Sequence, residues 1–431
     1  MIFTNNSFRI LASGVEVSSD CTKTFLNNND LVIGTTGCGK TRGYVAPLLA
    51  NACNETLIVT DPKGDLRRRF SGYLSDKGFQ IYDIDFADMV NSPDGYNPFD
   101  FVSRNPSTGR YVEQDIVTIA SEVVTMDNKL QPYFEENARV LMCALIAYVL
   151  EQYEEDKQDL KTLADIFGSC VTEQKFRFNR EADSGEKLLS DLFKPLEITN
   201  PDSTALFFWR MYRKIIGTDN TDKSIQSVLS GKLSSLAYEG PANLFRAKRR
   251  INIKDIVTMP SVVFIKTADT KYTMDNIIGL LFTQLLDKLC EYADYNCPDQ
   301  RLPIPVRLVL DDFGANTKIE AFDRIISVIR SRNIAVSIIL QSITQLDSIY
   351  GPENARTIIN NCDHMLYLGG TDEVTAESIS RRTNRSAYSI LNMGLKDAYL
   401  FERGRAPQKV IRFDISEHPD YRSIYGPEQT Q

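Results

Sequence analysis

The sequence has no apolar run long enough to cross a membrane, and it is poor in metal-binding side chains. Its longest apolar run is Val140–Leu150, whereas a transmembrane helix needs about 20 such residues. Met1–Gly14 mixes polar residues into every apolar stretch, so we expect no secretory signal peptide. The 8 cysteines form no Cys-x-x-Cys pair, and the only histidines are His364 and His418. This excludes a disulfide framework and a zinc site. We expect a soluble, cytoplasmic protein with reduced thiols.

Charge and size set a second group of limits. The chain has 431 residues and a net charge of −8, which suggests two or three domains. Its 42% hydrophobic and 25% charged residues are typical of a globular protein. A net negative charge excludes a protein that binds nucleic acid over its whole surface, but it permits binding at a few loops. Three local basic clusters are either such loops or solvated surface: Arg67–Arg69, Lys248–Arg250, and Arg381 and Arg382 with Arg385.

The strongest motif follows a short apolar strand, Leu31–Ile33. The segment Gly34–Thr41 fits G-x-x-x-x-G-K-[ST], and Arg42–Cys53 has helical spacing. Strand, glycine-rich turn and helix form the context that a phosphate loop requires. Its backbone N–H groups and the helix dipole hold phosphate, the lysine reaches the β- and γ-phosphates, and the hydroxyl binds magnesium. We predict that ATP binds at Gly34, Thr35, Thr36, Gly37, Cys38, Gly39, Lys40, Thr41 and Arg42, and that Thr41 is a Mg²⁺ ligand.

Two further strands end in polar side chains. Asp311 and Asp312 follow the apolar strand Val306–Leu310, and Gln341 follows Ala335–Leu340. The carboxyl ends of strands line the crevice where open α/β sheets bind ligands. Beside a phosphate loop, Asp311 is expected to hold magnesium and Asp312 to orient the attacking water. Gln341 is expected to bridge that water and the γ-phosphate. Taken alone, each is better explained as a polar residue that marks the end of a strand.

Two arginines end the helix predicted at Ile319–Arg332. Arg330 and Arg332 suit the negative end of a helix dipole, which is sufficient reason for cations there. The alternative is an arginine finger that enters a neighbouring subunit's site. Sequence spacing does not choose between these two roles.

Alternating strands and helices predict a parallel sheet covered on both faces. Strands at Thr56–Thr60, Gly78–Asp83 and Ser261–Ile265 flank a long stretch with helical periodicity, in which Leu206–Trp209 supplies bulk for a core. We predict an α/β nucleotide-binding domain from residues 1–108 and 251–431, interrupted by an all-helical insertion at 109–250. An antiparallel hairpin is expected near its end, from Asp397–Phe401 and Lys409–Phe413, and the tail after Pro419 is expected to be loosely held.

Several segments, in order along the chain, resemble the cytoplasmic ATPase part of type IV secretion coupling proteins, the TraG/TraD-like DNA pumps of conjugation. They extend from about residue 28 to 415. The resembling segments are Asn28–Gly34, Val59–Asp65, Tyr96–Asp100, Asp311–Asn316, Ile329–Ile334, Leu340–Leu346, Leu368–Asp372 and Thr375–Ser380.

This resemblance implies a RecA-like P-loop NTPase domain that assembles as a homo-hexamer around DNA. It implies that the helical insertion helps to select relaxase–DNA cargo and that the partners include type IV secretion channel components. It assigns phosphate, magnesium and sensor roles to Lys40, Thr41, Asp311 and Gln341, and a trans-acting role to Arg330. Asp61 and Lys63 match a family motif beside the site.

The sequence departs from the family pattern in two places. The family usually has Asp-Glu at Asp311-Asp312. A shorter side chain sets the carboxylate back by about 1.5 Å, and such a shift can cost on the order of 10²-fold in rate. Some Gram-positive-type members carry Asp-Asp, so we expect a working enzyme. Most members also have two amino-terminal membrane helices. Either the sequence is a piece of a longer protein, or the protein reaches the inner face of the membrane through a partner.

These observations favour an ATP-driven coupling protein with Mg²⁺-dependent ATPase activity. It would recruit relaxase–DNA cargo and pump DNA, single-stranded during transfer, to a conjugation channel. Two alternatives stay open at this point. One is a nucleotide-binding cargo receptor with little or no ATPase activity. The other is a related chromosomal DNA translocase.

Overall fold

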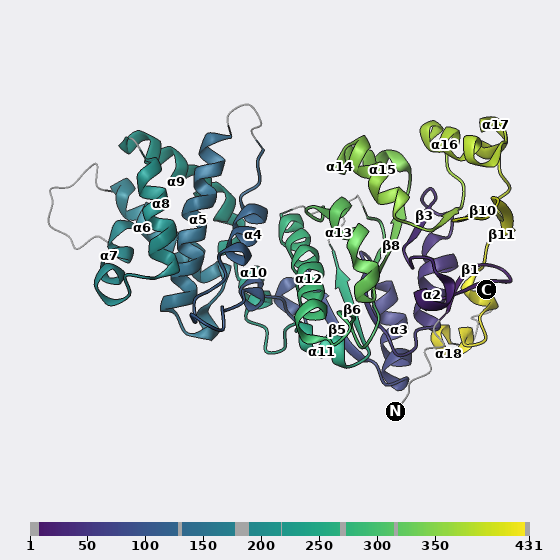
Figure 1. Ribbon diagram of the computed structural model, residues 1–431, viewed down its shortest axis with the longest axis horizontal. Coiled ribbons are helices and arrows are strands. Elements are labelled where there is room, and N and C mark those ends of the chain that lie inside the picture. The colour runs from purple at the N-terminus through teal and green to yellow at the C-terminus, as the bar shows by residue number, and fades with distance from the viewer. Residues whose placement is uncertain are drawn as a thin grey trace. The chain divides into compact units, whose positions relative to one another are not determined.

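The computed structural model describes residues 8–127, 132–176, 189–216, 218–267, 273–313 and 318–426, without the side chains of 171–176. Figure 1 shows the arrangement of its helices and strands. The chain forms two compact units. The larger, the sheet unit, comprises Met1–Ala87, Ile251–Tyr272 and Leu285–Gln431, and the smaller, the helical unit, comprises Asp88–Arg250 and Thr273–Gln284. The domain boundaries at 108 and 250 stay predictions.

The sheet unit contains, in its described part, a nine-stranded sheet in the order β11-β10-β9-β3-β8-β7-β4-β6-β5. The strands from β9 to β5 run parallel, and β10 and β11 add the expected antiparallel hairpin. The strands are β3 (Asp30–Ile33), β4 (Thr56–Thr60), β5 (Gln80–Asp85), β6 (Ser261–Lys266), β7 (Val306–Leu310), β8 (Ile334–Leu340), β9 (His364–Tyr367), β10 (Asp397–Glu402) and β11 (Gln408–Ile411).

Both faces of this sheet are buried, as continuous apolar strands in a parallel sheet require. Val32, Val309 and Ile339 belong to one core cluster, which α2, α3 and α18 cover with residues such as Leu49 and Phe70. Their strand neighbours point to the other face, and Leu31, Leu308 and Ile338 are fully buried as well. Strand β8 is buried along its whole length. The sheet therefore holds the strand ends, and the side chains that follow them, in fixed positions.

Short helices connect the strands of the sheet unit. A π-helix, η1 (Thr41–Val45), follows the glycine-rich loop and continues into α2. The α-helices are α1 (Cys21–Thr24), α2 (Ala46–Ala50), α3 (Asp65–Asp76), α11 (Ile253–Thr258), α13 (Phe322–Val328), α14 (Ile343–Tyr350), α15 (Pro352–Asn360), α16 (Glu373–Thr383), α17 (Ala387–Leu391) and α18 (Tyr421–Tyr425). Helix α12 (Asp275–Asn296) begins in the helical unit and ends in the sheet unit.

The helical unit packs around helix α5, which contacts α4, α6, α8 and α9. Its core includes Trp209, whose ring stacks on Phe193 with centroids 4.4 Å apart. The helices are α4 (Glu113–Val123), α5 (Tyr133–Gln152), α6 (Leu160–Phe176), α7 (Leu189–Thr199), α8 (Thr204–Ile215), α9 (Asp219–Leu233) and α10 (Glu239–Phe245).

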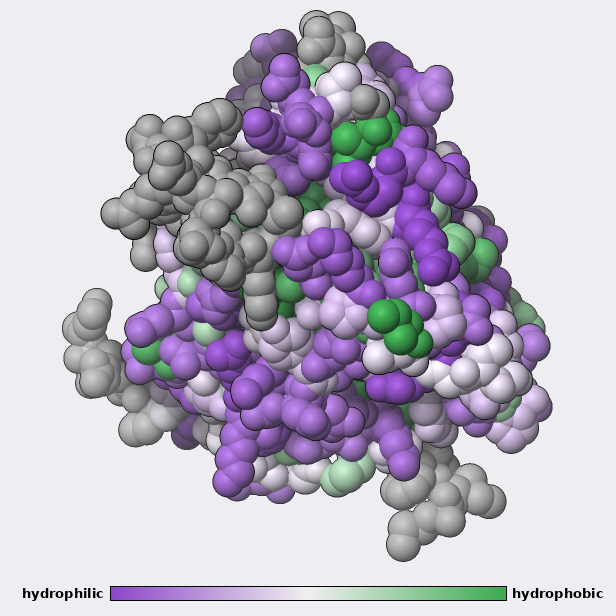
Figure 2. Space-filling view, turned by 90° about the vertical axis from the view of Figure 1, so that its left-hand side faces the viewer, coloured by the Kyte–Doolittle hydropathy of each residue, from purple (hydrophilic) through white to green (hydrophobic). Residues whose placement is uncertain are grey.

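The face in Figure 2 is mostly hydrophilic, and the hydrophobic residues of its described part lie in small separate patches.

Three features differ from the sequence predictions. Residues before the glycine-rich loop form a separate two-stranded sheet, β1 (Phe8–Ala12) and β2 (Val15–Ser18), which we did not predict. The helix expected at 319–332 is α13 followed by a 3₁₀ turn at Ile329–Arg332. The expectation of a loosely held tail is wrong up to residue 426, because α18 packs on α3 and buries Ile424. Within the described residues, no helix combines the length and apolar character that a bilayer span demands.

Candidate functional site

The candidate residues converge at the carboxyl ends of three strands. The glycine-rich loop follows β3, Gln341 follows β8, and Asp311 follows β7. Strand β8 lies between β3 and β7, so the three strand ends share one edge of the sheet. Within the described residues a cavity of ≈ 590 Å³ opens there, lined by Thr41, Asp311, Asp312 and Gln341 among others. The sheet thereby brings together residues that are far apart in the sequence.

The glycine-rich loop is anchored at its start and open at its centre. The Gly34 N–H donates to Leu340 O at 3.0 Å, and the Thr35 N–H donates to Gly369 O at 3.1 Å. Gly37 and Gly39 have φ of 79° and 90°, which favour glycine over residues with a Cβ. Within the described part of the chain, the N–H groups of Gly37 and Gly39 donate to no protein oxygen. A turn with free N–H groups before a helix is an anion site.

Lys40 follows this turn and is buried. Its ammonium donates to the loop's own carbonyl oxygens, Gly34 O at 2.8 Å and Thr35 O at 3.3 Å. An anion in the loop would offer the same ammonium a charged acceptor, and charge-assisted hydrogen bonds are stronger than those to a neutral carbonyl. The lysine is therefore already held at the anion site of the loop.

The loop and the acidic strand end meet directly. The Thr41 hydroxyl donates to Asp311 Oδ2 at 2.9 Å, and Thr60 Oγ1 donates to Asp311 O at 2.9 Å. Burial of Asp311, together with the adjacent charge of Asp312, raises the pKa of Asp311 to about 6. A hydroxyl and a buried carboxylate supply oxygen ligands, which suit a hard divalent cation. Residues Thr41 and Asp311 therefore fit Mg²⁺.

Asp312 and Gln341 line the same cavity from neighbouring strand ends. Asp312 has a φ of 53°, an uncommon conformation for a residue other than glycine and one that often marks a functional site. Its N–H donates to Asp311 Oδ1 at 3.1 Å. The Gln341 N–H is held by Gln345 Oε1 at 2.8 Å. Residues 314–317 lie outside the described residues, and with them the later part of the predicted Asp311–Asn316 segment.

The cavity lining also includes residues far from the phosphate motif, among them Asp61, Arg69 and Tyr425. Asp61 is buried, accepts the Arg67 N–H at 2.8 Å, and has its pKa raised by burial. Arg69 lies over the Tyr425 ring, 4.8 Å from its centroid. The sequence segment at Asp61 had marked the first of these, and the basic cluster had included Arg69. Tyr425 had no sequence signal, because it arrives from the other end of the chain on α18.

Two predicted loop residues face partners within the protein. Arg42 lines the cavity but forms a two-bond ion pair with Asp414, at 2.7 and 3.0 Å. Cys38 is partly buried, which raises the pKa of its thiol, and its carbonyl accepts Arg412 Nη1 at 2.8 Å. Both contacts tie the loop to the end of the β10–β11 hairpin.

The structure does not bring Arg330 to this cavity. Arg330 precedes β8 and Gln341 follows it. Seven strand residues separate them, or roughly 23 Å at about 3.3 Å per residue. Arg330 is exposed, and within the described residues it has no carboxylate partner. Arg332, in contrast, is paired through two bonds with Asp294 at 2.8 and 2.9 Å. The two arginines that sequence spacing left equivalent are thus distinct, and Arg330 is the available one.

Comparison with known protein families agrees with this geometry. Residues 13–413 match the family described as type IV secretory system conjugative DNA transfer. The chain belongs to this family. The VirD4 protein of Rhizobium rhizogenes is 20% identical over 375 residues, 87% of this chain and 52% of the relative. The chain thus spans about half the length of the curated relatives that it matches.

Solved structures of this coupling-protein family have the same fold. The unbound conjugative coupling protein TrwBdeltaN70 superposes with a TM-score of 0.63 at 20% identity, covering 94% of this chain and 88% of that one. TrwB in complex with ADP and Mg²⁺ gives a TM-score of 0.60 at 19% identity, over 89% and 85% of the two chains. The predicted fold, a RecA-like α/β domain combined with a helical domain, is confirmed.

Proposed function

We propose that this family member is an ATP-driven coupling protein, in which Mg²⁺-dependent ATP hydrolysis moves DNA toward a type IV secretion channel. The observation that carries the proposal is the 2.9 Å contact between Thr41 Oγ1 and Asp311 Oδ2. It joins an anion-binding loop to a buried carboxylate, which is the pairing that nucleotide-dependent ATPases use to hold Mg²⁺. TrwB, of the same fold, has been solved with ADP and Mg²⁺.

Each side chain has a proposed task in this site. The free N–H groups of the loop and Lys40 bind the phosphates, while Arg42 and Cys38 hold the loop in place. Thr41 and Asp311 bind Mg²⁺, which when bound neutralises charge on the phosphates. Asp312 orients the attacking water and accepts its proton, and Gln341 positions the same water. Asp61 and Lys63 border the cavity from β4.

The partners follow from family membership and remain part of the proposal. We infer that relaxase-bound DNA, single-stranded during transfer, is the cargo and that the helical unit takes part in its selection. We infer a homo-hexamer at the inner, cytoplasmic face of the cell membrane. The separation of Arg330 from its own cavity supports such an assembly, because an arginine finger at that position can act only on another copy.

ATP hydrolysis by wild-type protein and Lys40→Ala tests the proposal. The rate is measured with Mg²⁺ or with a chelator, and with or without single- and double-stranded DNA. We expect Mg²⁺-dependent hydrolysis that Lys40→Ala lowers by on the order of 10²–10³, as when one transition-state donor is removed. Stimulation by single-stranded rather than double-stranded DNA would identify the cargo form.

The two alternative functions predict other outcomes of the same experiment. A nucleotide-binding cargo receptor would bind ATP but hydrolyse it no faster than Lys40→Ala, under every condition. A chromosomal translocase would be stimulated mainly by double-stranded DNA. Wild-type protein that neither binds nor hydrolyses ATP would contradict all three.

A further inference from the structure

The three arginines of the basic cluster on helix α3 have different surroundings. Arg67 and Arg68 each form an ion pair with a carboxylate. Arg69 is exposed as well, but among the described residues it has no carboxylate partner. Its guanidinium lies over the ring of Tyr425, with the central carbon 4.8 Å from the ring centroid. Of the three arginines, Arg69 is the one that lines the cavity at the strand ends.

The Tyr425 ring beneath Arg69 is fixed by the packing of α18 on α3. It stacks on Tyr421, with ring centroids 4.8 Å apart and an angle of 19° between the ring planes. Phe70 meets it edge-on, with centroids 6.3 Å apart, and Phe70 is fully buried in the core of the sheet unit. A cation over an aromatic face is attracted by the electrons of the ring. The core therefore holds the ring, and the ring holds the guanidinium of Arg69.

This cluster adjoins the first turn of the helix that follows the glycine-rich loop. Arg42, the residue after the phosphate motif, lines the cavity and pairs with Asp414. Asp414 and, more weakly, the Tyr421 hydroxyl raise the pKa of Arg42 above its ordinary value. Burial raises the pKa of Tyr425, and the charges of Arg42 and Arg69 oppose this rise. Arg42 and Arg69 therefore lie around the two stacked tyrosines, at one end of the cavity.

The two ends of the cavity suit the two ends of a nucleotide. The N–H groups of a phosphate loop bind the α- and β-phosphates, and its lysine reaches the β- and γ-phosphates. With the γ-phosphate toward Asp311, the α-phosphate lies toward the start of the next helix, where Arg42 is located. A nucleoside joined to that α-phosphate extends away from Asp311. It thus reaches the end of the cavity that Arg69 and Tyr425 line.

The wall of the cavity around Arg69 suits an uncharged planar group. Its lining side chains from the segment 61–69 include two carboxylates, of Asp61 and Asp65, and two cations, of Lys63 and Arg69. These charges sum to zero, so this wall has no excess of positive charge for a further phosphate. A guanidinium is planar and weakly hydrated, and it stacks on aromatic faces. A nucleobase offers such a face and carries no charge.

We propose that the guanidinium of Arg69 stacks on the base of a nucleotide bound at the glycine-rich loop, with Tyr425 as the positioning residue that supports it. The proposal rests on the proposed nucleotide-dependent function and adds the side chain that contacts the base. Tyr425 acts through Arg69 and does not itself contact the nucleotide. Its ring is the part that matters, so its hydroxyl is dispensable.

Binding of two ligands to the full chain tests the role of Arg69. Titration calorimetry with Mg²⁺ compares ADP with pyrophosphate, which has two phosphates but no nucleoside. We expect Arg69→Ala to raise the Kd of ADP by on the order of tenfold, the effect of losing one base stack, and to leave the Kd of pyrophosphate unchanged. The matched control is Arg67→Ala, which removes an equal charge from α3 outside the cavity lining and should match wild type for both ligands.

Two results of this titration would overturn the proposal. An equal rise in Kd for ADP and pyrophosphate in Arg69→Ala would show that Arg69 acts on the phosphates. Unchanged Kd values for both ligands would show that it contacts neither part of the nucleotide.

Variants of Tyr425 test the support of the guanidinium. Tyr425→Phe keeps the ring and should bind ADP as wild type does. Tyr425→Leu should raise the Kd of ADP but not that of pyrophosphate, and circular dichroism verifies that the variant is folded. The double variant with Arg69→Ala should bind ADP no more weakly than Arg69→Ala alone, because residues that act through one another are not additive. Additive losses, or weaker pyrophosphate binding by folded Tyr425→Leu, would overturn the positioning role.

Photo-cross-linking locates the base without any need for hydrolysis. An ADP analogue with a photoreactive azide on its adenine ring is irradiated with wild-type protein and Mg²⁺, and labelled peptides are identified by mass spectrometry. Label on peptides that contain Arg69 or Tyr425, abolished by excess ADP, would support the proposal, and label confined to other segments would overturn it. Protein that gave the expected label but hydrolysed no ATP would refute the ATPase function and leave the base site standing. Protein that bound neither ADP nor pyrophosphate would overturn both.

Discussion

Two buried aspartates lie near the two ends of one strand and have opposite electrostatic surroundings. Asp30 begins β3 and is 1% exposed. Asp311 contacts the loop that follows β3 and is 7% exposed. Burial alone raises the pKa of both carboxyl groups. The neighbours of Asp30 reverse that effect. At Asp311 the charge of Asp312 adds to it, and Thr41 and Lys40 offset it only in part.

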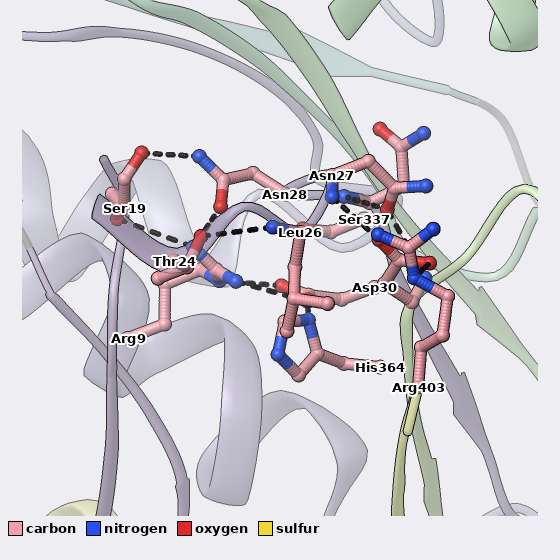
Figure 3. Close-up of polar contacts among 12 residues, drawn as sticks. Arg9, Ser19, Thr24, Leu26, Asn27, Asn28, Asp30, Ser337, His364 and Arg403 are labelled. Carbon is pink, nitrogen blue, oxygen red and sulfur yellow. Dashed lines mark hydrogen bonds and ion pairs between the residues drawn. The ribbon is translucent and has the colours of Figure 1, made fainter. Parts of the chain in front are cut away.

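Cationic and hydroxyl groups from four other segments surround Asp30, and Figure 3 shows two of them, Arg9 and His364. Arg9 Nε lies 2.7 Å from Asp30 Oδ2, and Arg307 Nη1 lies 3.4 Å from it. His364 Nδ1 lies 3.3 Å from Asp30 Oδ1, and the Tyr44 hydroxyl also donates to this carboxylate. Although burial opposes ionisation, the two arginines hold the pKa of Asp30 well below its usual range.

Asp311 lies beside the Thr41 hydroxyl and the Asp312 carboxylate rather than beside an arginine. The result is a carboxyl group whose charge is poorly compensated by the protein at neutral pH. The comparison shows which buried charge serves the fold and which is available to a ligand. Protein groups compensate the charge of Asp30, which links β1, β3, β7, β9 and the helix after the phosphate loop, whereas we propose that Asp311 binds a cation.

The largest expected effect concerns Asp30→Asn. Because this change removes the carboxylate that pairs with the buried Arg9 and Arg307, we expect a loss of about 3–5 kcal/mol in the free energy of unfolding. Urea denaturation at neutral pH measures it. A loss below about 1 kcal/mol would mean that the cluster contributes little to the fold.

The loss of unfolding free energy in Asp30→Asn should depend on pH. A carboxyl group with a lowered pKa in the folded state stabilises the protein above its unfolded pKa, here 3.8, and loses this contribution as the pH falls toward the folded pKa. The gap between wild type and Asp30→Asn should therefore be full above roughly pH 5 and shrink below roughly pH 4. A gap that stayed constant down to pH 3 would contradict a lowered pKa of Asp30.

Asp311→Asn should have the opposite character. It removes a carboxylate that is poorly compensated, so stability at pH 7 should equal or exceed that of wild type. A raised carboxyl pKa stabilises below 3.8 and loses that contribution as the pH rises through about 6. We expect ATP hydrolysis to fall by on the order of 10²–10³. An Asp311→Asn protein as unstable as Asp30→Asn would contradict the poorly compensated charge of Asp311.

Mg²⁺ and nucleotide should stabilise only proteins with an intact site. At a ligand concentration of about 100 times Kd, wild type should gain about 2.7 kcal/mol, visible as a rise in Tm with Mg²⁺ and ADP together. Asp30→Asn should gain the same increment from its lower baseline. Asp311→Asn should gain less, and a full gain in that variant would remove Asp311 from the magnesium site.

The smallest effect concerns Arg332, the neighbour of the proposed arginine finger. Its pair with Asp294 is partly exposed, so Arg332→Ala should cost only about 0–1 kcal/mol in stability. Its ATPase rate should equal that of wild type, whereas Arg330→Ala should lose on the order of 10³ or more. Equal losses of ATPase rate in Arg332→Ala and Arg330→Ala would show that the pairing of Arg332 with Asp294 does not distinguish the two arginines.

The sequence predicted the phosphate loop, the acidic strand end and most of the sheet, because each is a local pattern. Strands Thr56–Thr60 and Val306–Leu310 were predicted with their observed bounds. The Asp30 cluster was not predicted, since its members come from distant segments and Arg9 is a charged residue inside a strand. The packing of α18 and the pairing of Arg332 were missed because both depend on tertiary contacts that no local pattern encodes.

We propose that the ATPase site is shared between copies of this chain. The most direct test is the rate of ATP hydrolysis per subunit across a range of protein concentrations, with single-stranded DNA present and Lys40→Ala in parallel. We predict a rate per subunit that rises with concentration, as cavities acquire Arg330 from a neighbour, and that Lys40→Ala abolishes. A Lys40-dependent rate per subunit that stayed constant from the most dilute sample upward would contradict a shared site.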